Sequence, residues 1–288
     1  MNKYSFLALA VTVAVPGTAL AEVSGSIDLS YSVFDPNDGD SFTSPSLKAD
    51  LSYGGENGLL LDLSAGTKRY MVDGFDLDVN EANIDLGYAF GNGFYAGIFA
   101  ESFSFGYDIT SRGVFAGYDA GHFAGEAYFG TMEVPFSEDT NQFGFRGTYS
   151  LGGNTDFAAE VARTTSDEFD DDLDYLGLSV SHKLSDTFGV FGSVQRLSGA
   201  FDEDLTAVSL GGSYTLSNGM SIALEVARLK LDVSEVDSAT LGFSIPLGGK
   251  SKSVSPADGV AADVAGGSRG AYSKVLKDYT FLFGFVEG

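Results

Sequence analysis

The 288-residue chain contains no cysteine and no tryptophan, and it has only six prolines and two histidines. Without cysteine it cannot build a disulfide scaffold, a thiolate metal site or a cysteine nucleophile. Basic residues are also scarce, because 16 Lys and Arg face 40 Asp and Glu, which gives a formal net charge of −24. A chain this acidic repels phosphate backbones, so we expect no nucleic-acid partner.

Residues 1–21 have the three parts of a secretory signal peptide. Lys3 supplies the positive start, residues 6–15 form an apolar run, and Ala-Leu-Ala at 19–21 is a small-residue cleavage site. The apolar run is too short for a comfortable membrane anchor, and no later stretch approaches the roughly 18 apolar residues of a membrane helix. We therefore expect cleavage near Ala21 and export of the mature chain.

Glycine and aromatic residues are abundant instead, with 38 Gly, 24 Phe and 14 Tyr, and this balance favours β-structure. Apolar and polar residues alternate strictly, as in Ile27, Leu29, Tyr31 and Val33, which is the pattern of a strand with one apolar face. Fourteen such segments follow one another. They begin near residues 23, 47, 59, 82, 94, 112, 123, 142, 156, 175, 188, 206, 220 and 238.

The connections between these segments alternate in predicted length. Every second one is a tight turn, such as residues 91–93, whereas the others are mostly longer and acidic, such as 35–45, 68–80 and 164–173. Aromatic residues flank the tight turns on the apolar face, as at a membrane interface: Tyr53, Phe90, Phe94, Tyr118, Phe123, Tyr149, Phe157, Phe188 and Tyr214. A soluble β-sandwich would alternate too, but it need not separate its loops in this way. The sequence therefore predicts an all-β, transmembrane, antiparallel up-and-down barrel of about 14 strands.

Residues 22–249 form the predicted barrel, and residues 250–288 differ from it. This tail holds five bases and four acids, against ten bases and 36 acids in 22–249, and its first half is rich in Gly, Ser and Ala. We interpret it as a low-complexity periplasmic segment. Aromatic alternation over 279–285 leaves open a final hairpin, which would raise the count to 16 strands.

If the apolar faces contact lipid, the polar faces line the lumen. The predicted pore-lining residues are Asp28, Lys48, Asp50, Asp62, Asp85, Glu101, Glu126, Arg146, Glu160 and Glu225. Eight of these are acids, and acidic residues in a pore favour cations. Fourteen strands enclose more space than side chains readily fill, so we expect an open or partly open channel. A plugged lumen, in a structural or adhesive barrel with acidic loops, is the alternative.

Four arginines end upward strands at positions of lipid-facing parity: Arg69, Arg163, Arg196 and Arg228. The forked donors of a guanidinium suit phosphate, which predicts a rim that binds lipopolysaccharide. Simple snorkelling of cations to the membrane interface is the alternative.

No enzyme chemistry is expected, and neither are catalytic residues, cofactors or a metal site. His122 and His182 are the only histidines, and neither shares a predicted pocket with a nucleophile and an acid. The acidic segment at 35–40 does not match calcium-loop spacing, and the one at 167–172 is interpreted as a solvated charge run.

Residues 21–27, Ala-Glu-Val-Ser-Gly-Ser-Ile, and the acidic, Gly- and aromatic-rich meander over 22–249 resemble the alphaproteobacterial Gram-negative porins. The resemblance implies 16 strands, a homotrimer, a third loop folded into the pore and a terminal Phe read by the barrel-insertion machinery. This chain departs from that pattern, because its third long connection, 104–111, is short and residues 285–288 read Phe-Val-Glu-Gly. The pore role is what carries over: passive diffusion of small hydrophilic solutes through the outer membrane.

Overall fold

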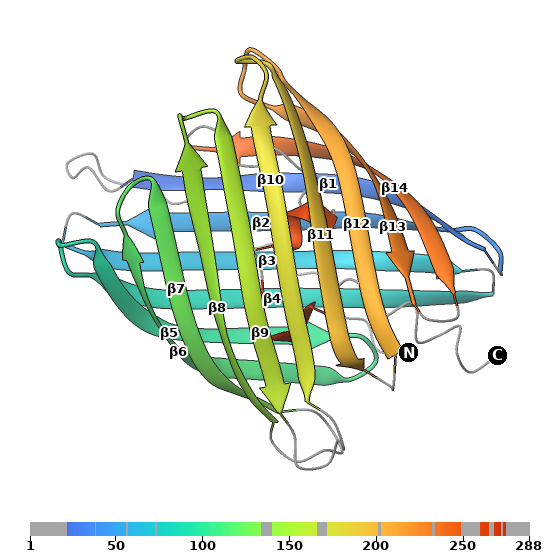
Figure 1. Ribbon diagram of the computed structural model, residues 1–288, viewed down its shortest axis with the longest axis horizontal. Helices are drawn as coiled ribbons and strands as arrows, with labels where there is room; N and C mark the ends of the chain where they lie inside the picture. The colour runs from blue at the N-terminus through green and yellow to red at the C-terminus, as the bar shows by residue number, and fades with distance from the viewer. Residues whose placement is uncertain are drawn as a thin grey trace, which may run out of the picture.

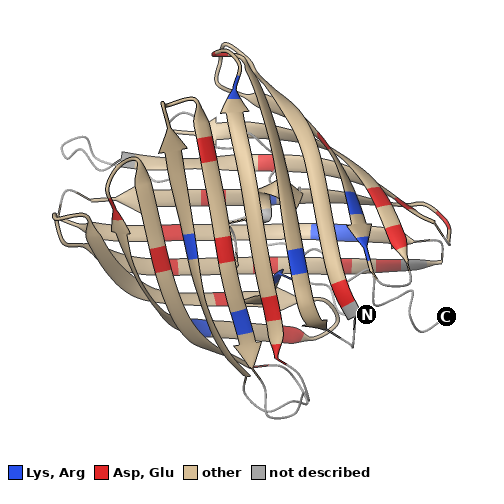
Figure 2. Cartoon of the chain, viewed as in Figure 1, with Lys and Arg blue, Asp and Glu red and all other residues tan. Residues whose placement is uncertain are grey.

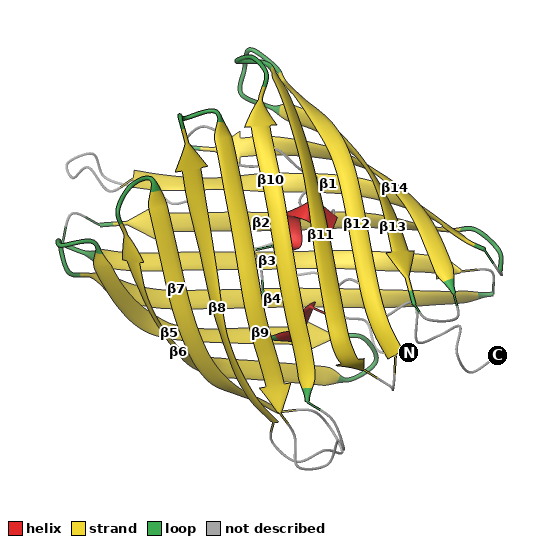
Figure 3. Cartoon of the chain, in the orientation of Figure 1, coloured by secondary structure: helices red, strands yellow, loops and turns green. Residues whose placement is uncertain are grey.

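The structure, a computed structural model, describes residues 22–37, 39–55, 57–72, 74–133, 140–165, 172–200, 203–231, 234–248, 260–264, 268–271 and 273–274. The predicted signal peptide lies outside these residues. Nearly all of the described chain is strand (Figure 3). The strands are β1 (Glu22–Pro36), β2 (Phe42–Gly54), β3 (Leu59–Val72), β4 (Phe75–Ala89), β5 (Phe94–Ser104), β6 (Asp108–Asp119), β7 (Phe123–Glu133), β8 (Thr140–Leu151), β9 (Thr155–Thr165), β10 (Leu173–Lys183), β11 (Phe188–Ala200), β12 (Glu203–Thr215), β13 (Ser221–Lys230) and β14 (Glu235–Leu247), followed by the 3-10 helix η1 (Val260–Asp263).

Each strand pairs with the next, and β14 pairs with β1, so the sheet closes into an antiparallel barrel. In Figure 1, β7–β12 run steeply across the front wall while β1–β4 cross behind them. This confirms the predicted 14-strand up-and-down barrel. The alternative of 16 strands is wrong, because direct pairing of β14 with β1, with Ile27 opposite Ile245, leaves no edge for another hairpin.

The strands extend further toward the predicted loop end than the sequence indicated. Residues 68–80, predicted as a long loop, form the end of β3 and the start of β4, with residues 73–74 between them. Likewise, residues 37–41 alone separate β1 from β2. The extension was hidden because acidic residues on the outer face interrupt the apolar alternation there. The difference in loop length between the two ends is therefore smaller than predicted.

The outer face of the barrel is apolar. The side chains of Ile98, Val114 and Phe129 are 56 %, 54 % and 54 % exposed, and all but one of the predicted turn-flanking aromatics are also exposed. Rings pair there between strands, as in Phe94 with Tyr118, whose centroids lie 4.8 Å apart. An exposed apolar surface this continuous is stable against lipid. None of the helices among the described residues has the length and apolar character needed to cross a membrane.

Aromatic rings on the inner face lie against glycines of neighbouring strands. A Cβ on Gly113 of β6 or on Gly130 of β7 would come within 2.7 or 2.9 Å of the Phe99 ring on β5. Glycine thus clears the space in which an inward ring lies flat on the sheet. Part of the chain's high glycine and aromatic content is explained by this pairing.

The described parts of the 250–288 tail lie inside the barrel. In Figure 1 they are the red segments between the front and back walls. Arg269 is 0 % exposed, and its partners come from the inner faces of β4, β5 and β7. This differs from the predicted periplasmic location, and residues 271, 273 and 274 are helical, not strand as a final hairpin requires. The physical reason is attraction between the tail's bases and the acidic interior.

Candidate functional site: the charged interior of the barrel

A guanidinium from the tail lies at the centre of the acidic interior. Arg269 Nη1 and Nη2 donate to the two oxygens of Asp85 at 2.9 and 2.8 Å, which is a bidentate fork. Its Nε and Nη2 also donate to Glu126 Oε1, and its backbone N–H donates to Glu101 Oε1 at 2.9 Å. The guanidinium stays charged in proteins, so it compensates carboxylates that would be costly to bury alone.

Two aromatic rings complete the surroundings of this guanidinium. The Arg269 Cζ lies 4.6 Å from the ring centroid of Phe99 and 4.8 Å from that of Phe115. Cation–π contacts of this kind strengthen when water is excluded. We call Asp85, Glu101, Glu126, Phe99 and Phe115 the guanidinium cage.

A second tail cation reaches a different carboxylate. Lys274 Nζ lies 2.9 Å from Glu160 Oε2 on β9, and 5.3 Å from the ring centroid of Tyr175 on β10. The Tyr128 hydroxyl on β7 donates to Glu160 Oε1 and accepts the backbone N–H of Gly270, linking the two cation sites. A network of carboxylates and the Tyr128 hydroxyl thus holds Arg269, Gly270 and Lys274 against the barrel wall.

The start of the described tail is held by the opposite side of the barrel. The Ala261 N–H donates to Glu225 Oε1 of β13 at 3.2 Å, and the Gln195 side chain of β11 donates to the carbonyl of Val260. Described parts of the tail therefore contact β11 and β13 as well as the strands that form the guanidinium cage.

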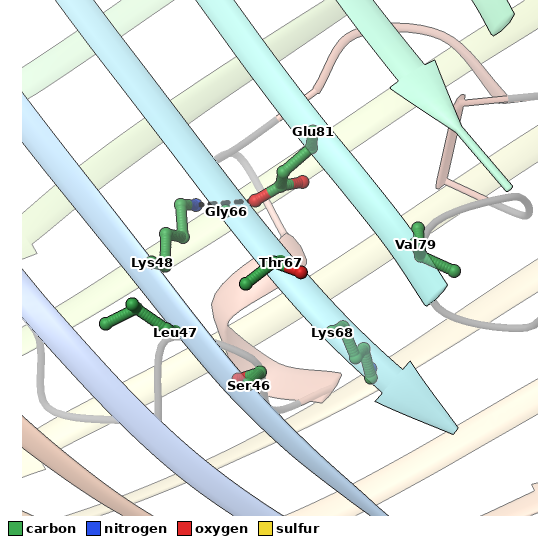
Figure 4. Close-up of a pocket in the computed structure, with 8 residues that line it drawn as sticks. All are labelled: Ser46, Leu47, Lys48, Gly66, Thr67, Lys68, Val79 and Glu81. Carbon is green, nitrogen blue, oxygen red and sulfur yellow. Dashed lines mark ion pairs between the residues drawn. The ribbon is translucent and has the colours of Figure 1, made fainter. Parts of the chain in front are cut away.

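Away from the tail, Lys48 of β2 and Glu81 of β4 approach each other across β3. Their charged atoms lie 3.8 Å apart, and Gly66 of β3 lies between them (Figure 4). Gly66 is in register with both residues, so a side chain there would meet Glu81. Lys48, Gly66 and Glu81 line a small pocket, and Lys68 lines it as well. Lys48 also pairs with Asp50, at 3.7 Å.

Near the predicted loop end, the inner face carries mainly apolar residues, with Lys68 lying over the ring of Tyr70. Phe34 and Phe42 stack with centroids 4.8 Å apart and an interplanar angle of 10°. They belong to a buried set that we call the apolar belt: Phe34, Phe42, Tyr70, Val79, Leu173, Leu197, Leu205, Leu229 and Val236. Where apolar side chains narrow a pore, they can close it by excluding water.

The structure brings five of the ten residues predicted to line the pore into contact with the described part of the tail. Asp85, Glu101, Glu126, Glu160 and Glu225 all contact the tail, and the remaining ones are placed separately. Arg146 pairs with Glu126 at 2.9 Å, Lys48 pairs with Asp50, Asp28 is buried and accepts from Ser26, and Asp62 is exposed opposite Asp85. Acidic positions are distributed over strands of both walls (Figure 2).

The sequence did not predict several residues of this site. Glu81 continues the inward parity of Asp85, but it lies between the predicted loop 68–80 and the strand predicted to begin near residue 82, whereas β4 already begins at Phe75. Arg269 and Lys274 lie in a tail without periodicity, so no pattern indicated that they enter the barrel. Phe99 and Phe115 alternate with outward residues like any other strand residue, and their signal was an inward glycine opposite each, Gly113 and Gly97.

The four arginines of the predicted rim lie on the outer face, and each pairs with an aspartate of the neighbouring strand. Arg69 with Asp78 and Arg228 with Asp237 form bidentate pairs between residues directly opposite each other. The other two arginines behave alike: Arg163 pairs with Asp174 and Arg196 pairs with Asp204. Arg112 with Glu133 adds a fifth such pair at 2.7 Å.

The two histidines lie apart from this interior site. His122 is in the turn between β6 and β7, and its ring packs against Tyr149. His182 Nδ1 is 2.8 Å from the Thr155 hydroxyl. Among the described residues, no group of three or more His, Cys, Asp and Glu side chains is arranged to hold a metal ion.

A closed barrel with an apolar outer face and a charged inner face is the architecture of an outer-membrane channel. The sequence agrees, because residues 47–200 match the family model of the Gram-negative porins. The chain belongs to that family, which makes it a porin-like outer-membrane barrel and points away from an enzyme. The narrower alphaproteobacterial assignment stays a prediction, and no curated protein matches the sequence.

Solved structures share the fold at low sequence identity. The anion-selective porin from Comamonas acidovorans superposes with a TM-score of 0.55 and 12% identity, over 80% of this chain and 100% of that one. A porin structure refined at 1.8 Å resolution gives a TM-score of 0.49 and 18% identity, over 78% of this chain and 100% of that one. A loop-deletion variant of Vibrio cholerae OmpT gives 0.48 and 12%, over 79% and 99%. At 12% identity, the likeness to the Comamonas acidovorans porin shows the fold alone.

Proposed function

We propose that the protein is a passive outer-membrane channel that admits small hydrophilic solutes and prefers cations. The observation that carries the proposal is the excess of acids on the inward strand positions, where Asp28, Asp50, Asp62 and Glu81 join the acids that face the tail. Carboxylates along a pore of low-dielectric walls raise the local concentration of cations and repel anions.

The tail moderates this preference and narrows the path. Arg269 and Lys274 place two positive charges among Asp85, Glu126 and Glu160, so the net negative charge of the interior is smaller than that of the strands alone. Solutes must then pass beside the tail, along the part of the interior that the Lys48–Glu81 pair and Asp62 line. Asp50 and Asp62 are the more exposed of the inward acids, and we assign to them the larger share of the selectivity.

A structural or adhesive barrel with a plugged lumen is the second candidate, and two observations favour it. Described parts of the tail lie inside the barrel, and the side chains of the apolar belt near the loop end are at most 8% exposed. In that case the acidic surface loops would carry the function.

Single-channel recordings in planar bilayers separate these candidates. We expect the full chain to give discrete conductance steps, and the variant R269A/K274A to give larger ones because the tail loses both ionic anchors. Absence of steps from both proteins, each shown to be folded by heat-modifiable migration on a gel, would favour the plugged barrel.

We also propose that the outer arginines contact lipopolysaccharide phosphates. What supports this is their position on the outer face at the ends of β3, β9, β11 and β13 and their planar donors, which suit phosphate as well as carboxylate. Each aspartate partner holds its guanidinium in a fixed orientation while lowering its net positive charge, so binding depends on several arginines together. The signal peptide, the homotrimer and recognition by the insertion machinery also stay predictions.

A further inference from the structure

We propose that the guanidinium cage is a binding site for solutes that carry a guanidinium group, and that Arg269 occupies it as an internal ligand. The inference rests on the proposed function, since a cation-admitting channel brings such solutes to the site. The pore role alone specifies neither guanidinium compounds as ligands nor the guanidinium cage as the place where they bind.

The geometry of the cage fits a planar, forked cation. Asp85 accepts two parallel hydrogen bonds from one edge of the guanidinium, and Glu126 accepts from Nε and Nη2 along the adjoining edge. Phe99 and Phe115 lie within 4.6 and 4.8 Å of the guanidinium carbon. A planar cation can satisfy both carboxylates and both rings at once, whereas an ammonium is a compact point charge.

The second tail cation shows the contrast within the same barrel. Lys274 pairs with the carboxylate of Glu160 and lies near the ring of Tyr175. An ammonium is a compact point charge and cannot form the bidentate fork that Arg269 makes with Asp85. The cage therefore differs from its neighbour in the features that select a guanidinium.

The cage also has more acceptor capacity than the tail uses. Glu101 is 3% exposed, and its Oε1 accepts the Arg269 backbone N–H. Its other oxygen, Oε2, is buried without a hydrogen-bond partner among the described residues, and so is Oδ1 of Asn83, which lies directly opposite Glu101. Buried acceptors are rarely left unpaired. A ligand with a further N–H group near its guanidinium, as in an arginine-like molecule, would satisfy them.

The barrel wall builds the cage independently of the tail. Its residues lie on β4, β5, β6 and β7, and Asp85 is in register with Phe99. Gly113 leaves room for the Phe99 ring, because a Cβ there would approach it to 2.7 Å. Packing within the barrel wall thus helps to hold the Phe99 ring that the guanidinium contacts.

The position of Arg269 in the same chain determines how free ligands compete. A tethered ligand acts at an effective concentration on the order of millimolar. A free guanidinium compound at micromolar concentration therefore cannot displace Arg269 from the native chain. Removing the Arg269 side chain should expose the site to such a compound.

The test uses the full-length variant R269A in detergent micelles, with methylguanidinium as the probe and methylammonium as the matched control cation. Isothermal titration should show binding of methylguanidinium with a dissociation constant roughly ten-fold lower than that of methylammonium, because the bidentate fork is lost with the latter. Argininamide, which adds N–H donors, should bind more tightly than methylguanidinium. The native chain should bind none of these compounds at the same concentrations. The variant R269A/D85N should bind methylguanidinium and methylammonium with similar affinity.

A second variant, and a readout that is independent of conduction, keep the outcome decisive. If R269A does not fold, as judged by heat-modifiable migration, R269K retains a charge in the cage without the fork and should still exchange for methylguanidinium. Equal affinity of the folded variant for the two cations, or no binding by it, would overturn the proposal. Calorimetry needs no conduction, so a barrel that binds methylguanidinium yet prefers anions contradicts the proposed function alone, whereas a cation-selective barrel that binds neither probe contradicts this inference alone.

Discussion

Arg269 and Asp85 lie 184 positions apart in the chain, yet the guanidinium of one donates to both oxygens of the other at 2.9 and 2.8 Å. This pair joins a segment beyond the last strand to the inner wall of β4. The interior of the barrel thus contains a site that is occupied by a residue of the same chain.

Loss of this guanidinium should destabilise the barrel. In R269M, Asp85, Glu101 and Glu126 would face one another with less compensation, and breaking a buried ion pair costs about 3–5 kcal/mol. Urea unfolding in lipid vesicles measures the change. R196Q, which removes an arginine that is 59% exposed and paired with Asp204, is the matched control and should cost at most about 1 kcal/mol. Equal losses in both variants would show that the interior cluster is not a stabilising element.

The inward acids nearest to solvent should set the selectivity. D50N/D62N removes two negative charges from the inner face, and we expect the ratio of cation to anion permeability to fall roughly two-fold, since surface potentials of a few kT control local ion concentration. D76N, which removes an acid from the outer face of β4, should leave the ratio unchanged. A fall in both variants would mean that the overall charge of the protein, not the charge of its lumen, controls permeation.

Glycine at position 113 should be required for the position of Phe99. G113A would place a Cβ against the backbone oxygen of Phe129 and 2.6 Å from Gly130 Cα, so the strands must shift. Overpacking of this kind costs about 1–3 kcal/mol. A Cβ at Gly212, by contrast, has its nearest contact at 3.5 Å, and G212A is the control. Unfolding free energies that do not differ between the two variants would argue against the ring-on-glycine packing.

The strands could be predicted from the sequence, because a two-residue period repeats wherever a sheet separates lipid from an interior. All fourteen predicted strands exist, and Leu29, Ile84 and Val208 lie exposed on the outer face as their parity indicated. The ends of β3 and β4 could not be placed, since paired charges such as Arg69 and Asp78 replace apolar residues on their outer faces.

Only part of the candidate site could be predicted from the sequence. Parity assigned Asp85, Glu101 and Glu126 to one face, but it could not place Arg269 among them. That contact depends on where a non-periodic segment lies in space, and no local pattern encodes such a position. The excess of acids indicated an attraction for cations. In the structure, Arg269 and Lys274 of the same chain pair with some of these acids.

The outer arginines offer a test that is independent of the lumen. Replacing Arg69, Arg163, Arg196 and Arg228 together by Gln should lower the amount of lipid A that co-purifies with the barrel, because the forked donors to phosphate are lost. The same four positions changed to Lys retain the charge and should recover part of the binding. Unchanged lipid A in the Gln variant would contradict the proposed rim.

The central claim is that this barrel conducts ions and that its acidic interior selects cations. The most direct measurement is the reversal potential of single channels of the full chain in a planar bilayer under a KCl gradient. We predict a reversal potential displaced toward the potassium equilibrium potential, and a larger displacement for R269A/K274A, which removes two positive charges from the interior. A reversal potential displaced toward the chloride equilibrium potential in both proteins would contradict the account.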